Sequence, residues 1–193
     1  MPGQAKILSL QEIQSVFKLL DDIRDKTIFA LGVYTGLRIS EIVSLKKEQV
    51  FTEYGVKYQL VVYRLKKRDT VWSEIPITTK LRQILIEYRK SVTEDKRTWV
   101  TDSLYLFPSD ESDSGHLSRK QAHNILNKTF TALKLEKAST HSMRRTLLTT
   151  LSRGGIPLRT IQQISGHSNL GQLQAYLEVD PEDKHKALSS IKY

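Results

Sequence analysis

Five side chains suited to phosphate chemistry stand out in this 193-residue sequence. Arg38 lies in the first quarter of the chain, and His141, Arg144, His167 and Tyr176 lie in the last third. Guanidinium groups donate fixed bidentate hydrogen bonds to phosphate oxygens and stay charged. Imidazoles donate hydrogen bonds or protons near neutral pH, and a phenol can attack phosphorus and remain attached as an ester. The set therefore predicts attack on a phosphodiester without a metal ion.

Each of these residues alone also has a purely structural explanation. Arg38 could pair with Glu41, and either histidine could be a capping or turn residue. Tyr176 lies among leucines, which by itself indicates core packing. Only the whole set is specific. The absence of cysteine excludes a disulfide framework, and no carboxylate cluster suited to two magnesium ions is evident, which argues against a metal-dependent nuclease.

The charge balance indicates a polyanionic partner. The formal net charge is +9, while 39% hydrophobic residues are enough for the core of one compact domain. The basic clusters are separate and each lies beside an expected loop or helix start, at residues 66–68, 119–120 and 144–145. No apolar run reaches the roughly 20 residues that span a bilayer and no signal region opens the chain, so we expect a soluble, intracellular protein.

Hydrophobic periodicity predicts a mainly helical α+β domain. A two-residue period between about 56 and 78 predicts a hairpin with a basic tip, and a short strand near 50–51 would make the antiparallel sheet three-stranded. Residues 93–117 are expected to form a long surface loop. Helices are predicted at 9–24, 25–35, from Ser40 onward, 79–91, 118–133, 141–153, 157–165 and 169–177.

Three segments resemble those of the tyrosine recombinase (phage integrase) superfamily. Residues 35–41 (TGLRISE) resemble its first arginine box, residues 141–146 (HSMRRT) its His-x-x-Arg box, and residues 164–168 (ISGHS) its Leu-Gly-His-Ser segment. Tyr176, nine residues after His167, falls where the family places its nucleophile. The match runs from about Leu8 to Tyr176. The chain departs from the family in two places. Arg145 stands where a histidine is usual, and Ser165 precedes Gly166 where a leucine–glycine pair is usual. Neither departure removes expected chemistry.

The resemblance implies a role for each of the five residues. Arg38 and Arg144 would clamp the scissile phosphate, and His141 and His167 would hydrogen-bond to it and assist proton transfer. Tyr176 would attack, giving a 3′-phosphotyrosyl link and a free 5′-hydroxyl. The resemblance implies no metal, nucleotide or other cofactor.

The family's general acid is a lysine on a β-hairpin, and two residues compete for this role. Lys67 is the first choice because its distance from Pro76 best resembles the family's hairpin, and Lys66 is the close alternative. A shift of one residue in a strand reverses the face, so the two are distinct hypotheses. Glu41 would be the supporting acidic residue. DNA contacts are expected at Arg64, Arg68, Arg119, Lys120 and Arg145.

The resemblance also implies a domain plan and partners. Residues 1–178 would be the catalytic domain, and residues 179–193 a tail that packs on a neighbouring protomer or frays on its own domain. The family's N-terminal core-binding domain is expected to be absent, as in an excised catalytic domain or in a compact recombinase like the fimbrial phase-variation inverters. The partners would be double-stranded DNA and three further copies in a homotetramer on paired sites, in the bacterial cytoplasm.

The expected function is site-specific cutting and rejoining of duplex DNA. Two alternatives remain open: nicking and resealing like a type IB topoisomerase, and a DNA-binding accessory protein without activity. The sequence does not reveal the target site, because base readout depends on side chains whose groove positions are unknown. It also leaves integration, excision, inversion and resolution open.

Overall fold

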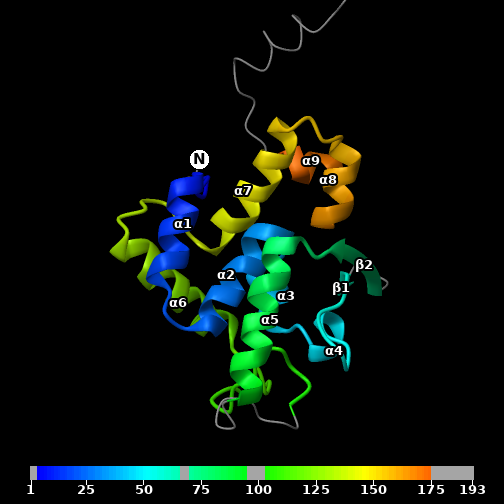
Figure 1. Ribbon diagram of the computed structural model, residues 1–193. Coiled ribbons are helices and arrows are strands. Elements are labelled where there is room, and N and C mark those ends of the chain that lie inside the picture. Colours follow the sequence, from blue (N-terminus) through cyan, green and yellow to red (C-terminus); the bar gives the residue numbers. More distant parts are fainter. Residues whose placement is uncertain (1–3, 66–69, 95–102, 175–193) are drawn as a thin grey trace, which may run out of the picture.

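The computed structural model describes residues 4–65, 70–94 and 103–174 (Figure 1). The fold is α+β and mainly helical, as expected from the sequence. In chain order the elements are α1 (Leu10–Leu19), α2 (Ile23–Thr35), α3 (Ile39–Val43), α4 (Lys47–Val50), β1 (Gln59–Leu65), β2 (Thr70–Pro76), α5 (Thr79–Glu94), α6 (Arg119–Ala132), α7 (Thr140–Arg153), α8 (Leu158–Ser165) and α9 (Leu170–Gln174).

Helix α2 is the centre of the hydrophobic core. It is buried along most of its length and contacts α5, α6 and α7. Figure 1 shows α1 and α6 on one side of α2, the hairpin and α4 on the other, and α7, α8 and α9 at one end. Phe29 of α2 packs edge-on against Phe17 and Phe130, with ring centroids 5.0 and 6.3 Å apart. The core therefore holds elements from both halves of the chain around one helix.

The two helices expected over residues 9–24 and 25–35 are present, but the break between them comes earlier than expected. Ser9 caps α1 in a capping box with Glu12, and α1 ends at Leu19. The side chain of Asp22 then accepts a hydrogen bond from the backbone N–H of Arg24 and begins α2. An Asx cap of this kind competes with helix continuation, so the apolar periodicity runs across a real break.

The sheet expected to have three strands has two within the described residues. β1 and β2 pair antiparallel from Gln59 opposite Pro76 to Leu65 opposite Thr70. Where the third strand is expected, Val50 ends α4 and Phe51 makes only an isolated bridge to Val56. Gln49 explains the difference, because its amide accepts from the Lys46 N–H at 2.7 Å and donates to the Val61 carbonyl at 2.6 Å, which favours a helical turn.

A second, smaller core holds the last three described helices together. Leu148 of α7, Ile161 of α8 and Leu173 of α9 are fully buried against one another. The helix expected over residues 157–165 begins one residue later, because Pro157 is the N-cap residue of α8 and does not belong to its first turn. None of the described helices is both long and apolar enough to cross a membrane.

Candidate active site

Arg38 lies at the turn between α2 and α3. Gly36 ends α2 in the left-handed region, at φ +67°, which glycine adopts without strain. Arg38 is then the N-cap residue of α3, and its backbone N–H donates to Oε2 of Glu41 at 2.7 Å. Its Nη1 donates to Oε1 of the same carboxylate at 3.2 Å, and the side chain remains 41% exposed. The sequence-predicted supporting acid therefore orients an arginine that can still reach a ligand.

Arg144 joins two turns that lie far apart in the sequence. It is on α7 and only 1% exposed. Nη1 donates to the carbonyl of Gly36 at 2.6 Å, and Nη2 donates to the carbonyl of Ser165 at 2.8 Å. Backbone carbonyls thus fix the guanidinium between the turn that carries Arg38 and the turn that carries His167.

His167 follows the end of α8 and lies beside Arg144. Nη2 of Arg144 is 3.2 Å from Nε2 of the ring, and the hydroxyl of Ser165 is 2.8 Å from Nδ1. Burial lowers the pKa of His167 to about 4, with the positive charges of Arg144, Arg38 and Arg64 acting in the same direction. The imidazole is therefore neutral at neutral pH and available as a hydrogen-bonding group or proton acceptor.

His141 lies in the first turn of α7 and is exposed. Burial of part of the ring lowers its pKa, and Arg119, Arg144, Arg38 and His123 lower it further. The two histidines thus share the field of Arg38 and Arg144, which means that the structure brings four of the six expected catalytic residues together. His123, which the sequence did not single out, lies four residues after Arg119 on the same face of α6 and contributes to the field at His141.

Two expected DNA contacts have internal partners. Arg64 is 7% exposed and its guanidinium contacts Ser73 and the Ile164 carbonyl, while Arg145 is 6% exposed and donates to the Ala5 carbonyl and the Gln4 side chain. Both side chains pack elements of the protein together. Arg119 and Lys120, by contrast, are exposed at the start of α6 and remain available for phosphate contacts.

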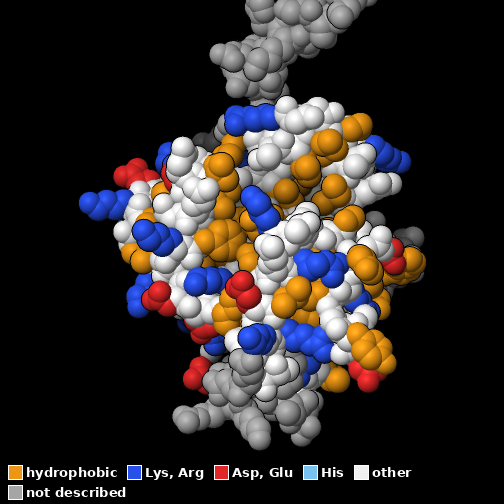
Figure 2. Space-filling model, viewed as in Figure 1, with side chains coloured by type: hydrophobic (Ala, Val, Ile, Leu, Met, Phe, Trp, Pro, Cys, Tyr) orange, Lys and Arg blue, Asp and Glu red, His pale blue; other side chains and the backbone are white. Residues whose placement is uncertain are grey.

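The remaining expected site residues, Lys66, Lys67, Arg68 and Tyr176, lie outside the described residues. The elements next to them are described. β1 ends at Leu65, and α9, whose Leu173 is anchored in the second core, ends at Gln174. Lys and Arg side chains are spread over the face shown in Figure 2, between apolar patches, so the positive charge is not confined to a tail.

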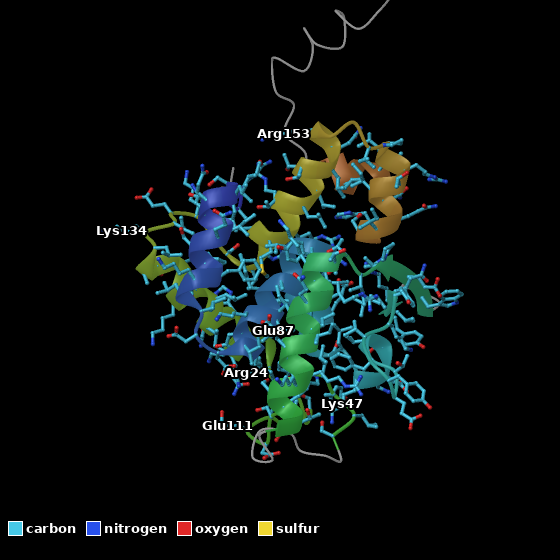
Figure 3. All side chains as sticks on the ribbon, in the orientation of Figure 1. Arg24, Lys47, Glu87, Glu111, Lys134 and Arg153 are labelled. Carbon is cyan, nitrogen blue, oxygen red and sulfur yellow. The ribbon has the colours of Figure 1, made fainter. Side chains whose placement is uncertain are left out.

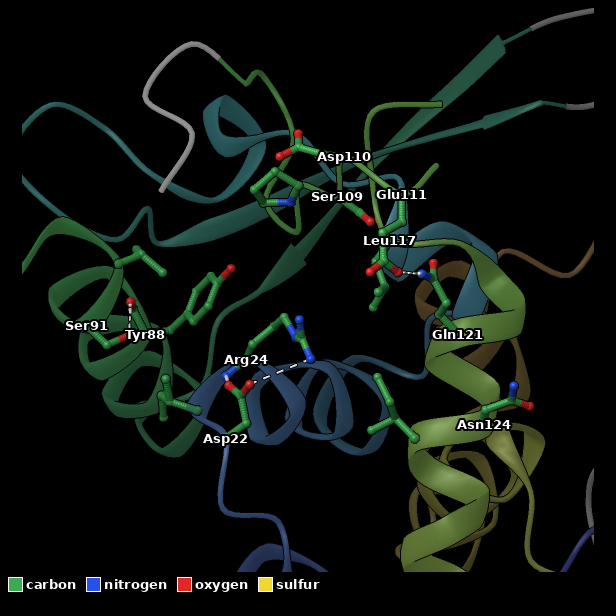
Figure 4. A pocket seen from close by; sticks show the side chains of 14 residues that line it. Asp22, Arg24, Tyr88, Ser91, Ser109, Asp110, Glu111, Leu117, Gln121 and Asn124 are labelled. Carbon is green, nitrogen blue, oxygen red and sulfur yellow. Dashed lines mark hydrogen bonds and ion pairs between the residues drawn. The ribbon is translucent and has the colours of Figure 1, made fainter. Parts of the chain in front are cut away.

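The described part of the molecule has cavities both beside the cluster around Arg144 and away from it. A cavity of about 370 Å³ adjoins the site and is lined by residues that include Arg64, Trp72, Gln162 and His167. A larger one, of about 1010 Å³, lies between α2, α5 and α6 (Figure 4). Arg24 and Glu111 of this larger cavity lie at the end of the molecule away from α7 (Figure 3).

The larger cavity lacks the convergence of groups seen around Arg144. Arg24 pairs with Asp22 and Asp25, and Glu111 accepts a hydrogen bond from Gln121. Among the described residues, no three His, Asp or Glu side chains gather where they could hold a metal ion. The cluster of Arg38, His141, Arg144 and His167 is therefore the candidate site.

Comparison with known proteins gives consistent matches over nearly the whole chain. The model of the phage integrase family matches residues 6–183. The tyrosine recombinase XerD of Bradyrhizobium diazoefficiens is 28% identical over 96% of this chain and 62% of its own length. The chain thus spans about half to three fifths of the length of the curated relatives it matches.

Solved structures share the fold. The crystal structure of XerA recombinase superposes with a TM-score of 0.79 at 21% identity, covering 100% of this chain and 68% of that one. The integrase of transposon Tn1549, in complex with circular intermediate DNA, superposes with a TM-score of 0.74 at 17% identity, covering 97% of this chain and 67% of that one.

Proposed function

Because the chain belongs to the phage integrase family, we propose that it cuts and rejoins duplex DNA at defined sites through a 3′-phosphotyrosine at Tyr176. One observation carries the proposal: Arg144 joins the Arg38 turn to the His167 turn, with His141 in the same positive field. Such a cluster of fixed donors suits the negative charge that develops on the nonbridging oxygens of a phosphate under attack.

The reaction can be written with residues in defined roles. Arg38 and His141 reach outward and donate to the scissile phosphate, while Arg144 is fixed behind them with His167. The phenol of Tyr176 attacks phosphorus and gives its proton to the neutral imidazole of His167. The bond to the 5′ oxygen breaks, and that oxygen takes a proton from Lys67 or Lys66. Attack of a 5′-hydroxyl on the phosphotyrosine reverses the steps, so the bond energy is retained.

The proposed partner is double-stranded DNA. The net charge of +9, the exposed Arg119 and Lys120, and the DNA complex of the Tn1549 integrase support it. Assembly of four copies on paired sites, a tail beyond residue 178 that packs on a neighbour, and a cytoplasmic location belong to the same proposal.

Covalent capture tests the proposal and finds the target sequence in the same experiment. A pool of nicked suicide duplexes of randomised sequence is incubated with the protein, and DNA that stays attached under denaturing conditions is recovered and sequenced. We expect an enriched site and an adduct that is lost in Tyr176→Phe. Tyr54→Phe, which loses the same hydroxyl from a side chain that is 92% exposed, should retain it. DNA binding with no adduct would indicate the inactive accessory protein.

Two further assays separate the open alternatives. Relaxation of a supercoiled plasmid that lacks the enriched site would indicate a topoisomerase. Lys66→Ala and Lys67→Ala are then compared on a substrate whose scissile 5′ oxygen is replaced by sulfur. Since a thiolate leaves with little need of a proton, this substrate restores cleavage only to the variant that lacks the general acid.

A further inference from the structure

Arg64 connects three elements from the interior of the molecule. It follows Leu60 and Val62 on the buried face of β1. Nη1 donates to the hydroxyl of Ser73 on β2 at 3.0 Å, and Nη2 donates to the carbonyl of Ile164 in α8 at 3.0 Å. This one guanidinium thus holds the hairpin against the helix that leads to the His167 turn.

The third connection of Arg64 reaches the first arginine box. Its Nε lies 3.4 Å from Oε1 of Glu41, the oxygen that also lies 3.2 Å from Nη1 of Arg38. A single carboxylate oxygen therefore balances two guanidinium groups, one partly exposed in the site and one buried behind it. Burial lowers the pKa of Arg64, the charge of Glu41 raises it, and an arginine stays protonated in this setting.

Packing against Gly166 makes the connection to the His167 turn specific. Gly166 has φ +68°, and a Cβ at this position would collide with the guanidinium of Arg64. The residue before it supplies the carbonyl that fixes Arg144, and the residue after it is His167. A displacement of Arg64 would therefore move groups on both sides of this turn.

We propose that Arg64 is a positioning residue of the strand-cleavage site, which holds the Arg38–Glu41 pair, the hairpin and the His167 turn in one fixed arrangement. This inference rests on the proposed function. It replaces the expected role of Arg64 as a DNA contact, because a buried guanidinium that has two internal hydrogen-bond acceptors and a carboxylate beside its Nε offers little to a phosphate outside. The planar fork suits the task, since its donors point in fixed and different directions.

The test separates positioning from DNA contact. Arg64→Met keeps much of the side-chain volume and removes every donor, and Arg119→Met does the same to an exposed arginine. For each protein we would measure affinity for a randomised duplex over a range of salt concentrations, and the first-order rate of adduct formation on the captured site. Misplacing reacting groups by about 1 Å can cost about 100-fold in rate.

Arg64→Met should slow adduct formation by about tenfold to 100-fold at saturating DNA, with affinity and salt dependence close to wild type. Arg119→Met should lower the slope of log affinity against log salt by about one phosphate contact. If Arg64→Met instead lowers the affinity and the salt slope, Arg64 is a DNA contact and the inference is overturned. A wild-type rate in a folded Arg64→Met also overturns it.

A second variant keeps the inference testable if Arg64→Met does not fold. Ser73→Ala removes the acceptor of Nη1 and leaves the arginine in place. It should slow adduct formation by a smaller factor in the same direction, again at unchanged affinity, and a wild-type rate would overturn the inference. If the wild-type chain forms no adduct, the proposed function fails and the inference falls with it. An active wild type with unaffected variants contradicts the inference alone.

Discussion

Nη2 of Arg144 lies 3.2 Å from Nε2 of His167, so a buried cation and a buried imidazole share the centre of the site. The contact is favourable only while the ring is neutral and can offer a lone pair. Protonation of His167 would place two positive charges together in an interior that already holds Arg64. The same charges would be relieved by a bound phosphate.

This relationship predicts a pH-dependent stability. The folded pKa of His167, about 4, lies below the ordinary value of 6.5, so the unfolded chain binds more protons between these two pH values. The free energy of unfolding should therefore rise with pH across this window, by at most about 3 kcal/mol for this residue. Urea unfolding at a series of pH values measures it. His167→Asn should flatten the rise, and an unchanged profile in this variant would contradict the assignment.

A glycine pair tests the packing of the His167 turn. Gly166 and Gly155 both have positive φ, +68° and +75°, but a Cβ meets Arg64 at the first and nothing within 4 Å at the second. Gly155→Ala should cost about 1 kcal/mol of stability for backbone strain alone. Gly166→Ala should cost clearly more, because it also displaces the guanidinium. Equal losses in urea unfolding would mean that the Arg64 contact contributes little.

Much of the site was predictable because its residues are fixed by local sequence. A glycine that ends a helix precedes both Arg38 and His167, and these turns lie where the boxes indicated. Charge alone could not show that Arg64 and Arg145 are buried, because their surroundings are set by distant residues: Glu41 and Ile164 for the first, Gln4 and Ala5 for the second.

Leu60, Val62 and Arg64 occupy every second position of β1, and this spacing was the one sign in the sequence that Arg64 is buried. The position of the break before α2, at Asp22, and the helical turn at Gln49 were missed for a related reason. In both places a polar side chain bonds to the backbone and overrides the apolar pattern.

Substitution of the buried Arg145 should lower stability, whereas substitution of the exposed Arg119 should weaken DNA binding. Arg145→Ala removes hydrogen bonds to the N-terminal segment and should lower the free energy of unfolding by roughly 3 kcal/mol, as for other buried charged donors. Arg119→Ala should leave stability within about 0.5 kcal/mol and weaken DNA binding more at low salt than at high salt. Thermal unfolding and salt-dependent binding of both variants check this. The opposite pattern would support Arg145 as a DNA contact.

The second core should influence the reaction of Tyr176, the proposed nucleophile, from a distance. Leu173, three residues before Tyr176, is fully buried with Leu148 and Ile161. Leu173→Ala should cost about 2 to 4 kcal/mol of local stability and slow adduct formation, although Leu173 has no chemistry of its own. Leu170→Ala, in the same helix but 37% exposed, is the control. Hydrogen exchange of α9 and the rate of adduct formation are measured for both variants. Equal exchange and equal rates in the two variants would contradict this coupling.

The most direct test of the account is to identify the bond between protein and DNA. Trypsin should release residues 160–184, which contain Tyr176 as their only tyrosine, from the captured adduct. Mass spectrometry, with the DNA labelled at one end of the cut strand, then identifies the linked residue and the strand end. The account predicts a phosphate ester between Tyr176 and the 3′ end, with a free 5′-hydroxyl opposite. Linkage to another residue, or to the 5′ end, would contradict it.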